Sequence, residues 1–259
     1  MSGYRRSSLV ALAALAARGC GDPGSPNIPD LSDGSLQLFG MLVADSTNHF
    51  IQVNQTDSRP IQRLDAVLSE VRPDGGLTPL ATTTVEGEGP GFTMVLEAVV
   101  LPGRRYQVTV TSPGHRTASA ATSVPGDFTI DSLVAAGDPP GSAGLRATWN
   151  ASAGGFRYIV NVRAKPDCQA NVCETFGLPW AGVTVAPRLD TIIPATAIPP
   201  DRTDAVEMAV YAVNRDMFEY FTTGVGGTFT VQPKQNVAGG YGVLGAWVRR
   251  ERVIRRQDR

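Results

Sequence analysis

The fold is decided by the stretch Arg105-Tyr106-Gln107-Val108-Thr109-Val110-Thr111 in a chain of 259 residues. Apolar side chains at Tyr106, Val108 and Val110 alternate with the polar side chains between them. This period of two is typical of a β-strand that buries one face and exposes the other. About seven short segments of this kind, separated by turns, occupy residues 36–124 and predict an antiparallel β-sandwich of immunoglobulin-like size.

Turn signals and apolar runs place the remaining elements. Pro73-Asp74-Gly75-Gly76 ends one strand, because proline presets φ and glycine accepts a positive φ. Further along, Trp149 and Tyr158 supply large apolar groups for a second core. The segment Asn214–Thr222 is the best helix candidate. The expected strands are 36–44, 50–55, 66–72, 92–96, 106–111, 145–150 and 156–164 as a hairpin, 183–193, 205–213, 229–232 and 241–248.

We therefore predict a mainly β protein. An N-terminal immunoglobulin-like antiparallel β-sandwich occupies residues 36–125, and a linker that contains one short strand follows at 126–143. A second β-rich domain with one short helix spans 144–248, and a basic C-terminal tail spans 249–259. No repeat of 20 to 50 residues is present in the sequence, which argues against a solenoid or a propeller.

The N-terminus has the layout of a secretory signal. Arg5 and Arg6 form a basic start, Leu9–Ala17 an apolar segment, and Gly19-Cys20 a small residue before a cysteine. The apolar segment falls far short of the roughly 20 residues that a membrane-spanning helix needs. This order of segments indicates export from the cytoplasm.

Cys20 resembles the lipidated cysteine of a bacterial lipoprotein. Residues 1–19 are then a lipoprotein signal peptide, and 20–35, rich in Gly, Pro, Asp and Ser, form a flexible tether. Ala17 and Arg18 depart from the usual lipobox, and a plainly secreted protein is the alternative. We expect lipidation at Cys20 to attach the chain to a membrane.

Composition fits an envelope protein and argues against nucleic acid as a partner. The chain has 23 Lys and Arg against 24 Asp and Glu, a net charge of −1, and the expected signal removes three of the arginines. Binding to phosphates needs a basic surface, which this balance does not supply. The 28 glycines and 19 prolines suit short strands joined by turns.

Cys168 and Cys173 remain as a pair once Cys20 is assigned to lipid. Their C-x4-C spacing fits a small disulfide-bonded loop in an oxidising compartment. Half of a metal site is a competing interpretation, but it needs more ligands, and His49 and His115 are far away in sequence. Two free thiols are the third possibility.

No motif predicts catalysis, a cofactor or a metal. Gly240-Tyr241-Gly242-Val243-Leu244-Gly245 matches G-x-G-x-x-G, but too few residues follow for a βαβ unit. We interpret this block as a glycine-rich strand that lets another backbone or an aromatic ring pack closely. His49 and His115 are expected at the surface beside turns. The acidic residues are scattered and are expected to face solvent: Asp65, Glu70, Glu86, Glu88, Asp201, Asp204 and Glu207.

Two features are candidate surface contacts. Trp180 lies in a turn-rich segment, where an exposed indole suits binding and a buried indole under a loop is the alternative. Arg249, Arg250 and Arg252 begin the basic C-terminal tail, which either touches anionic headgroups or is a solvated, frayed end.

Several motifs, in this order, resemble a family of bacterial outer-membrane lipoproteins, the domain of unknown function 4249. These motifs are the opening strand with Val53-Asn54-Gln55-Thr56, the run from Arg105 to Ala121, Val124-Pro125 with Ile130-Asp131-Ser132-Leu133, Phe218-Glu219-Tyr220-Phe221, and Asn236 to Ala246. Leu244 stands where the family usually has an aromatic residue. The family has no established activity, so the resemblance implies no site residues. Its members often accompany TonB-dependent receptors.

The sequence thus supports a cell-envelope lipoprotein of the outer membrane, facing the periplasm or the cell surface. The leading hypothesis is a non-enzymatic binding module that assists TonB-dependent uptake, with its ligand undefined. One alternative is an envelope hydrolase whose site assembles from scattered carboxylates. Another is a structural or adhesion protein.

Overall fold

The computed structural model describes residues 34–137, 144–164, 167–169, 172–174, 180–185, 189–197, 206–224 and 235–254. In this part of the chain the strands form four sheets, of seven, five, three and two strands. Every strand pair there is antiparallel except one, which joins the first and last strands. The prediction of a mainly β fold with antiparallel sheets and one short α-helix is confirmed.

The elements of the first half are all strands: β1 (Leu36–Val43), β2 (Asn48–Gln55), β3 (Ile61–Val71), β4 (Leu77–Gly89), β5 (Gly91–Glu97), β6 (Arg105–Thr111) and β7 (Ala118–Ser123). The second half contains β8 (Ile130–Ala136), β9 (Gly144–Trp149), β10 (Arg157–Ala164), β11 (Asp167–Gln169), β12 (Val172–Glu174), β13 (Trp180–Val185), β14 (Asp190–Ile193), η2 (Ala195–Ala197), β15 (Val206–Val213), α2 (Arg215–Gly224), β16 (Val237–Ala238) and β17 (Gly240–Ile254).

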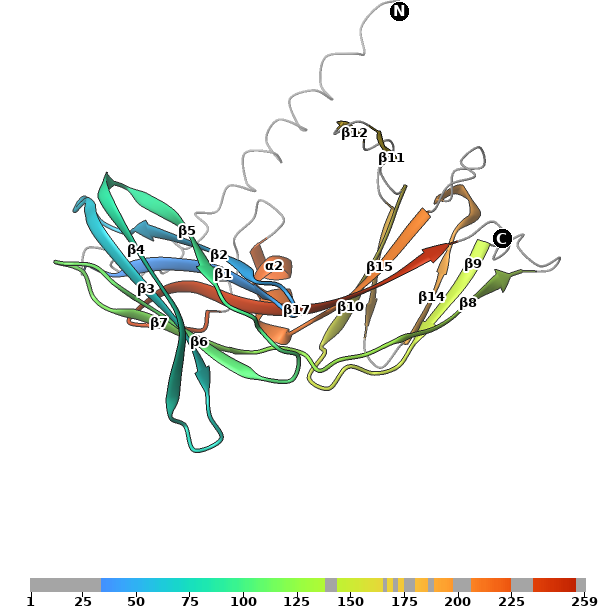
Figure 1. Ribbon diagram of the computed structural model, residues 1–259, viewed down its shortest axis with the longest axis horizontal. Coiled ribbons are helices and arrows are strands. Elements are labelled where there is room, and N and C mark those ends of the chain that lie inside the picture. Colours follow the sequence, from blue (N-terminus) through green and yellow to red (C-terminus); the bar gives the residue numbers. More distant parts are fainter. Residues whose placement is uncertain are drawn as a thin grey trace, which may run out of the picture.

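The first half is a β-sandwich. One layer has the order β17-β1-β2-β5 and the other the order β16-β7-β6-β3-β4 (Figure 1). Alternate residues of each strand fill the space between the layers, as in β6, where Tyr106, Val108 and Val110 are buried. The Tyr106 hydroxyl accepts a hydrogen bond from the Leu101 amide at 2.8 Å, which satisfies the polar end of this buried ring.

The second half adds two more layers. The seven-stranded sheet continues as β17-β15-β10-β13, and the three-stranded sheet β14-β9-β8 supplies a further layer. Trp149 and Tyr158 are both buried, with ring centroids 5.5 Å apart, so the predicted aromatic anchor of this core is confirmed. The hairpin predicted for residues 145–150 and 156–164 does not form, because β9 pairs with β8 and β14 while β10 pairs with β13 and β15.

Strand β17 belongs to both halves. Residues Gly240–Trp247 pair with β1, and Trp247–Ile254 pair with β15. One seven-stranded sheet therefore runs through both predicted domains, and β17 also continues past residue 248, where the sequence predicted the start of a basic tail (Figure 1). A single cluster of buried residues, which extends from Leu36 to Val248, spans both halves. The linker region contributes to it as well, because Phe128 is buried there.

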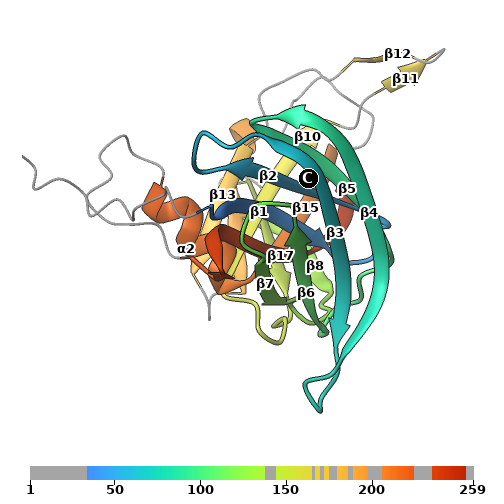
Figure 2. The same ribbon diagram turned by 90° about the vertical axis from the view of Figure 1, so that its left-hand side faces the viewer.

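The predicted helix Asn214–Thr222 corresponds to α2, which begins one residue later. Asn214 caps it, because its Oδ1 accepts a hydrogen bond from the Met217 amide at 3.2 Å. The helix packs on the outer face of the seven-stranded sheet, where the rings of Phe39 and Tyr220 lie 5.5 Å apart. In Figure 2, α2 projects on one side of the sandwich and β4 forms the opposite margin.

Candidate ligand-binding face

Strand β2 presents three side chains to the outside of the sandwich. Its buried residues alternate with Phe50, Gln52 and Asn54, which point away from the core. Phe50 is the most exposed large apolar side chain in the described residues, with 60% of its surface accessible. This exposed aromatic ring beside two amides makes the strand face a candidate contact site.

The register of the sheet extends this strand into a two-dimensional array. Met41 and Val95 flank Phe50 on the neighbouring strands. Since directly opposite residues share one face of a sheet, the three strands form a graded surface, apolar at one end and amide-rich at the other. We call it the β1–β2–β5 face, with Tyr220 of α2 against its Phe39 ring, and its residues are Gln37, Phe39 and Met41 of β1, Phe50, Gln52 and Asn54 of β2, and Gly91, Thr93 and Val95 of β5.

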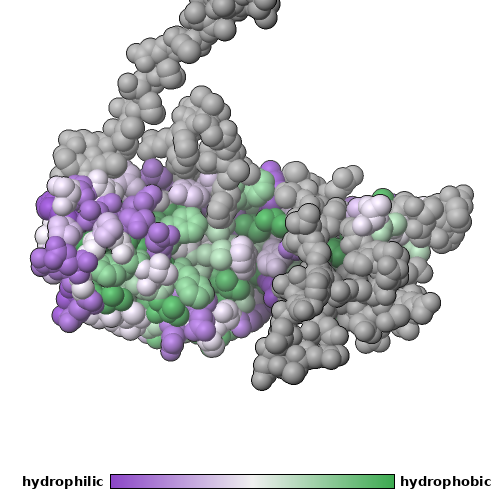
Figure 3. All heavy atoms as spheres, turned by 90° about the horizontal axis from the view of Figure 1, so that it is seen from above, coloured by the Kyte–Doolittle hydropathy of each residue, from purple (hydrophilic) through white to green (hydrophobic). Residues whose placement is uncertain are grey.

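Hydrogen bonds connect the amides of this face. The Asn54 Nδ2 donates to the Gln37 Oε1 at 3.2 Å, and the Gln52 Nε2 reaches the Asn54 Oδ1 at 3.5 Å. The side of the molecule seen in Figure 3 shows an apolar area bordered by hydrophilic residues. The amides are thus held in a partly ordered row beside apolar surface.

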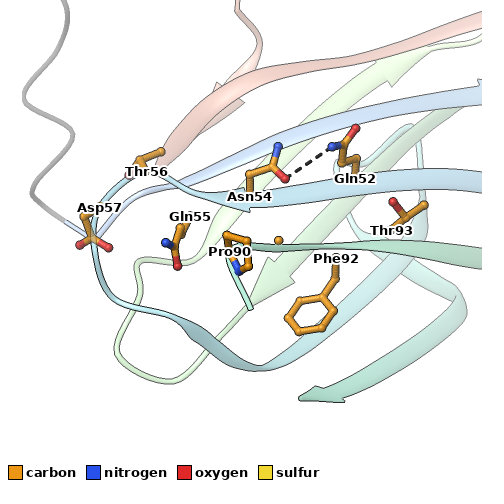
Figure 4. Close-up of a pocket in the computed structure, with 9 residues that line it drawn as sticks. Gln52, Asn54, Gln55, Thr56, Asp57, Pro90, Phe92 and Thr93 are labelled. Carbon is orange, nitrogen blue, oxygen red and sulfur yellow. Dashed lines mark hydrogen bonds between the residues drawn. The ribbon is translucent and has the colours of Figure 1, made fainter. Parts of the chain in front are cut away.

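A pocket of about 410 Å³ lies at the amide-rich end of this face. Gly91 stands opposite Asn54, and any side chain there would collide with the Asn54 amide, so the glycine leaves the strand surface open. Figure 4 shows Gln52, Asn54 and Thr93 on one side of the strands and the Phe92 ring on the other. The lining residues are Gln52, Asn54, Gln55, Thr56, Asp57, Pro90, Gly91, Phe92 and Thr93.

Asp57 is the only carboxylate in the lining of this pocket. Its Oδ2 accepts a hydrogen bond from the Arg59 Nε at 2.6 Å, and its Oδ1 accepts one from the Arg59 backbone amide at 3.0 Å. These hydrogen bonds from Arg59 hold the pKa of the Asp57 carboxyl below its ordinary value. The carboxylate is therefore already committed to an internal ion pair.

Gln55 also lines the pocket, but it is bonded through its backbone and not through its side-chain oxygen. Its backbone amide donates to the Pro90 carbonyl at 2.8 Å, which holds the ends of β2 and β5 together. Its side-chain Oε1 is buried, yet within the described residues it has no hydrogen-bond partner. Because Gln55 alternates with Asn54 along β2, its side chain lies on the opposite side of the strand from Gln52 and Asn54 (Figure 4).

His49 lies beneath this face and not at the surface, where the sequence placed it. The ring is fully buried. Its Nε2 faces the Ala98 carbonyl oxygen at 2.9 Å, and its Nδ1 accepts a hydrogen bond from the Val43 amide at 3.3 Å. Burial lowers the pKa of this imidazole, so it is a neutral structural group. The prediction was wrong because the strand begins at Asn48, which turns His49 inward.

The scattered carboxylates do not gather in the described part of the chain. Asp65 pairs with Arg63 at 3.0 Å, Glu70 with Arg104 at 3.7 Å, and Glu86 with Arg63 at 3.6 Å. The pKa of Asp65 is lowered by its hydrogen bonds from Arg63 and Thr84, as expected for a structural ion pair. Asp201 and Asp204 lie outside the described residues. Across the described ranges, no three His, Cys, Asp or Glu side chains come close enough to hold a metal ion.

The C-terminal arginines differ from the predicted tail. Residues 249–254 continue β17, where they pair with β15. The preceding residue of the strand, Val248, is buried in the core. Arg249 binds Glu207 at 2.7 Å, and Arg252 donates to the Asp131 carbonyl oxygen at 3.4 Å. Residues 255–259 are not among those described.

Arg250 connects distant parts of the chain. Its guanidinium pairs with Asp45 at 3.0 Å and with Asp127 at 2.5 Å. Asp45 lies in the turn between β1 and β2, and Asp127 precedes β8, so this one side chain bridges the two halves. Its charge is balanced within the protein, which leaves less of it for an anionic surface.

The structure describes the other predicted site residues only in part. Trp180 begins strand β13, opposite Val162, and so does not lie in a loop, but its side chain is outside the described set. Cys168 and Cys173 stand directly opposite each other in the β11–β12 pair. Such a register brings two Cα atoms to the separation that a disulfide spans. Cys20 and the expected signal lie outside the described residues.

The glycine block at 240–245 has the structural role that the sequence indicated. A side chain at Gly242 would meet the Leu38 carbonyl oxygen, because the backbones of β1 and β17 run very close there. Gly245 gives similar room to the Met217 side chain of α2. The prediction of a glycine-rich strand with close backbone packing is confirmed.

The sequence signal for the β1–β2–β5 face was present but incomplete. Phe50, Gln52 and Asn54 were within a predicted strand, and their alternation with Ile51 and Val53 assigns them to one side. What the sequence did not contain was the register, which brings in residues about 40 positions away. In the described residues, no helix is both long enough and apolar enough to span a bilayer.

No family model and no curated protein matches the chain. Among solved structures it is similar to α-2-macroglobulin from Salmonella (12% identity, TM-score 0.26), of which it spans only 15% while 89% of this chain is covered. It is also similar to the chicken CNTN1 FN1–FN3 domains (13% identity, TM-score 0.29, 86% of this chain and 67% of that one). CBD12 from CALX1.2 is a third match (9% identity, TM-score 0.26, 68% and 79%). The fold class therefore rests on the strand pairing described above.

Proposed function

We propose that this protein is a lipid-anchored binding module of the bacterial cell envelope, without catalytic activity of its own. The observation that carries the proposal is the β1–β2–β5 face, where an exposed aromatic ring and a row of amides border an open pocket. Exposed apolar surface with a polar rim is typical of a contact site. Four of the carboxylates that a hydrolase could use are each paired with an arginine: Asp65, Glu70, Glu86 and Glu207.

The proposed attachment to the membrane is a lipid anchor at Cys20. Lipidation at Cys20 would leave residues 21–33 as the tether, because Ser35 is already buried beside β1, and a chain of this length reaches roughly 45 Å when extended. The tether leads to β1, whose Leu36 pairs with Gln55 of the pocket. The candidate face would therefore lie within reach of the membrane, as suits an accessory of a membrane receptor. By family resemblance, we assign that receptor to the TonB-dependent class of the outer membrane.

Membrane fractionation of the native host tests the anchor. The wild-type protein is expected in the outer membrane, labelled by a lipid precursor, whereas Cys20→Ser is expected in the soluble fraction without label. The matched control is Cys168→Ser, which leaves the lipidation site intact and is expected to remain membrane-bound. Equal fractionation of wild type and Cys20→Ser would contradict the lipid anchor.

Affinity purification from solubilised outer membranes tests the receptor. We expect a TonB-dependent receptor, identified by mass spectrometry, to accompany the tagged wild-type protein. An unrelated lipoprotein with the same tag is the control and should not retain it. Absence of such a receptor from the wild-type sample would contradict the accessory role while leaving the anchor untouched.

A further inference from the structure

We propose that the β1–β2–β5 face and its pocket bind a neutral saccharide. This inference deepens the proposed function, since it names the ligand class of the same site. It rests on three properties of the face: the lack of available charge in the pocket, the donor and acceptor character of its polar groups, and the apolar surface next to them.

The polar groups of the pocket favour a neutral ligand. Asp57, the one carboxylate in the lining, is neutralised by Arg59 through two hydrogen bonds. The remaining lining groups are amides, threonine hydroxyls and apolar surface. A cationic or anionic ligand would lose its hydration without gaining an unpaired counter-charge, which is unfavourable.

Hydroxyl groups match these amides best. Each Gln and Asn side chain carries both donors and an acceptor, and a hydroxyl is likewise donor and acceptor in one group. Gln52 and Asn54 point from neighbouring out-facing positions of β2. The Gln55 side chain alternates with Asn54 and lies on the opposite side of β2 (Figure 4), so the polar contacts of this face come from Gln52 and Asn54. A ligand with many hydroxyls satisfies several such groups at once.

The apolar end of the face favours a ring over a linear polyol. Phe50 is 60% exposed and lies between Met41 and Val95, so its surroundings offer a flat apolar surface for the C–H face of a sugar. From Phe50 to Asn54 the strand covers about 13 Å. This length exceeds one sugar ring, so an oligosaccharide would touch both the aromatic end and the amide end.

An extended peptide cannot add to β2 by strand pairing, although β5 is the terminal strand of this sheet and the peptide comparator below tests that edge. β2 is paired with β1 on one side and β5 on the other, so its backbone groups are used within the sheet. Recognition of a peptide by added strand pairing needs a free backbone edge. Above β2 a ligand can contact only side chains, and these are two amides and an aromatic ring.

Calorimetric titration of the purified full chain in detergent tests the proposal. The probes are neutral hexasaccharides built from glucose, xylose, mannose or galactose, with an acidic oligogalacturonate and a neutral Gly-Ser peptide as comparators. We expect at least one neutral hexasaccharide to bind. Gln52→Ala or Asn54→Ala should each weaken that binding about fivefold, and Phe50→Ala about tenfold.

Matched controls come from the same sandwich. Gln107 donates to the Thr109 hydroxyl at 3.2 Å on the other sheet, so Gln107→Ala removes a comparable amide away from the face. Leu77→Ala removes an exposed apolar side chain at the start of β4. Both variants should bind the hexasaccharide as wild type does. Because the three test residues are surface residues, thermal unfolding should be similar for all variants, which separates lost binding from lost folding.

Three results would overturn the saccharide proposal. These are no binding of any neutral hexasaccharide at millimolar concentration, binding that is unchanged in the Phe50, Gln52 and Asn54 variants, and tighter binding of the peptide or the acidic oligomer. Receptor purification remains a separate measurement. If a receptor accompanies the wild type but not Phe50→Ala, and no saccharide binds, the face is a protein contact and the proposed function stands without this ligand.

Discussion

Buried polar side chains set the tightest requirements at the scale of single residues. His49 sits with no accessible surface, between the Val43 amide and the Ala98 carbonyl. With Nδ1 as acceptor and Nε2 as donor, the ring is in its neutral form with the proton on Nε2. A second proton on Nδ1 would face the Val43 N–H and remove an acceptor, and it would place a charge in the core.

The free energy of unfolding should therefore fall as the pH drops below about 6.5. Burial lowers the pKa of His49 in the folded chain, while in the unfolded chain it is ordinary. Between these two values the unfolded chain binds more protons, so each pH unit costs at most about 1.4 kcal/mol. Urea unfolding from pH 7.5 to pH 5 should show this slope in the wild type and a shallower one in His49→Gln. Gln107→Ala, which changes a side chain of β6 that does not titrate, should keep the wild-type slope. An unchanged slope in His49→Gln would contradict this account.

At the scale of elements, the sequence predicted strands well where alternation coincides with burial. The sequence predicts β6 because the side chains of Tyr106, Val108 and Val110 all point into the core. β4 was missed because it lies at the margin of its sheet, where its side chains are exposed or half-buried and mostly polar. Pairing between strands was predicted less well, as the absent β9–β10 hairpin shows, because local pattern contains no information about distant partners.

Gly242→Ala should disrupt the pairing between strands β1 and β17. Gly242 has φ of +110° and lies against the Leu38 carbonyl oxygen, so alanine would be strained and would also collide with backbone. We expect a loss of about 3 kcal/mol or more in the free energy of unfolding, measured by urea denaturation. Gly154→Ala is the control, because Gly154 has φ of +75° with nothing within 4 Å. It should cost only about 1 kcal/mol. Equal losses would show that crowding at β1 is unimportant.

The β11–β12 pair should contain a disulfide. Cys168 and Cys173 are opposite each other in its register, and the exported compartment expected from the N-terminus favours oxidation. Alkylation of the protein isolated from the envelope, followed by mass spectrometry, should modify neither residue without reductant and both after reduction. Cys168→Ser should leave Cys173 open to alkylation without reductant. Modification of both cysteines in the untreated wild type would mean free thiols.

At the scale of the whole molecule, the two halves are less separate than composition indicated. Pro- and Gly-rich stretches around residues 125 and 140 are typical of a junction between domains. Strand β17 nevertheless pairs with β1 of the first half and with β15 of the second half. Arg250 adds a second link, through Asp45 and Asp127. The sequence did not contain this because a strand's partners are set by three-dimensional packing. The same limit applies to the β1–β2–β5 face, which needs three strands in register.

The shared strand predicts that both halves unfold together. Since β17 pairs with strands of each half and one buried cluster spans them, loss of its pairing with β1 removes support from β15 and β10 as well. Hydrogen exchange followed by mass spectrometry should show this in Gly242→Ala. Amides in β10 and β15 should lose protection in parallel with those in β3 and β6, while Gly154→Ala leaves both regions close to wild type. If β10 and β15 kept full protection in Gly242→Ala, the halves would be independent domains, and β17 would join them without coupling their stability.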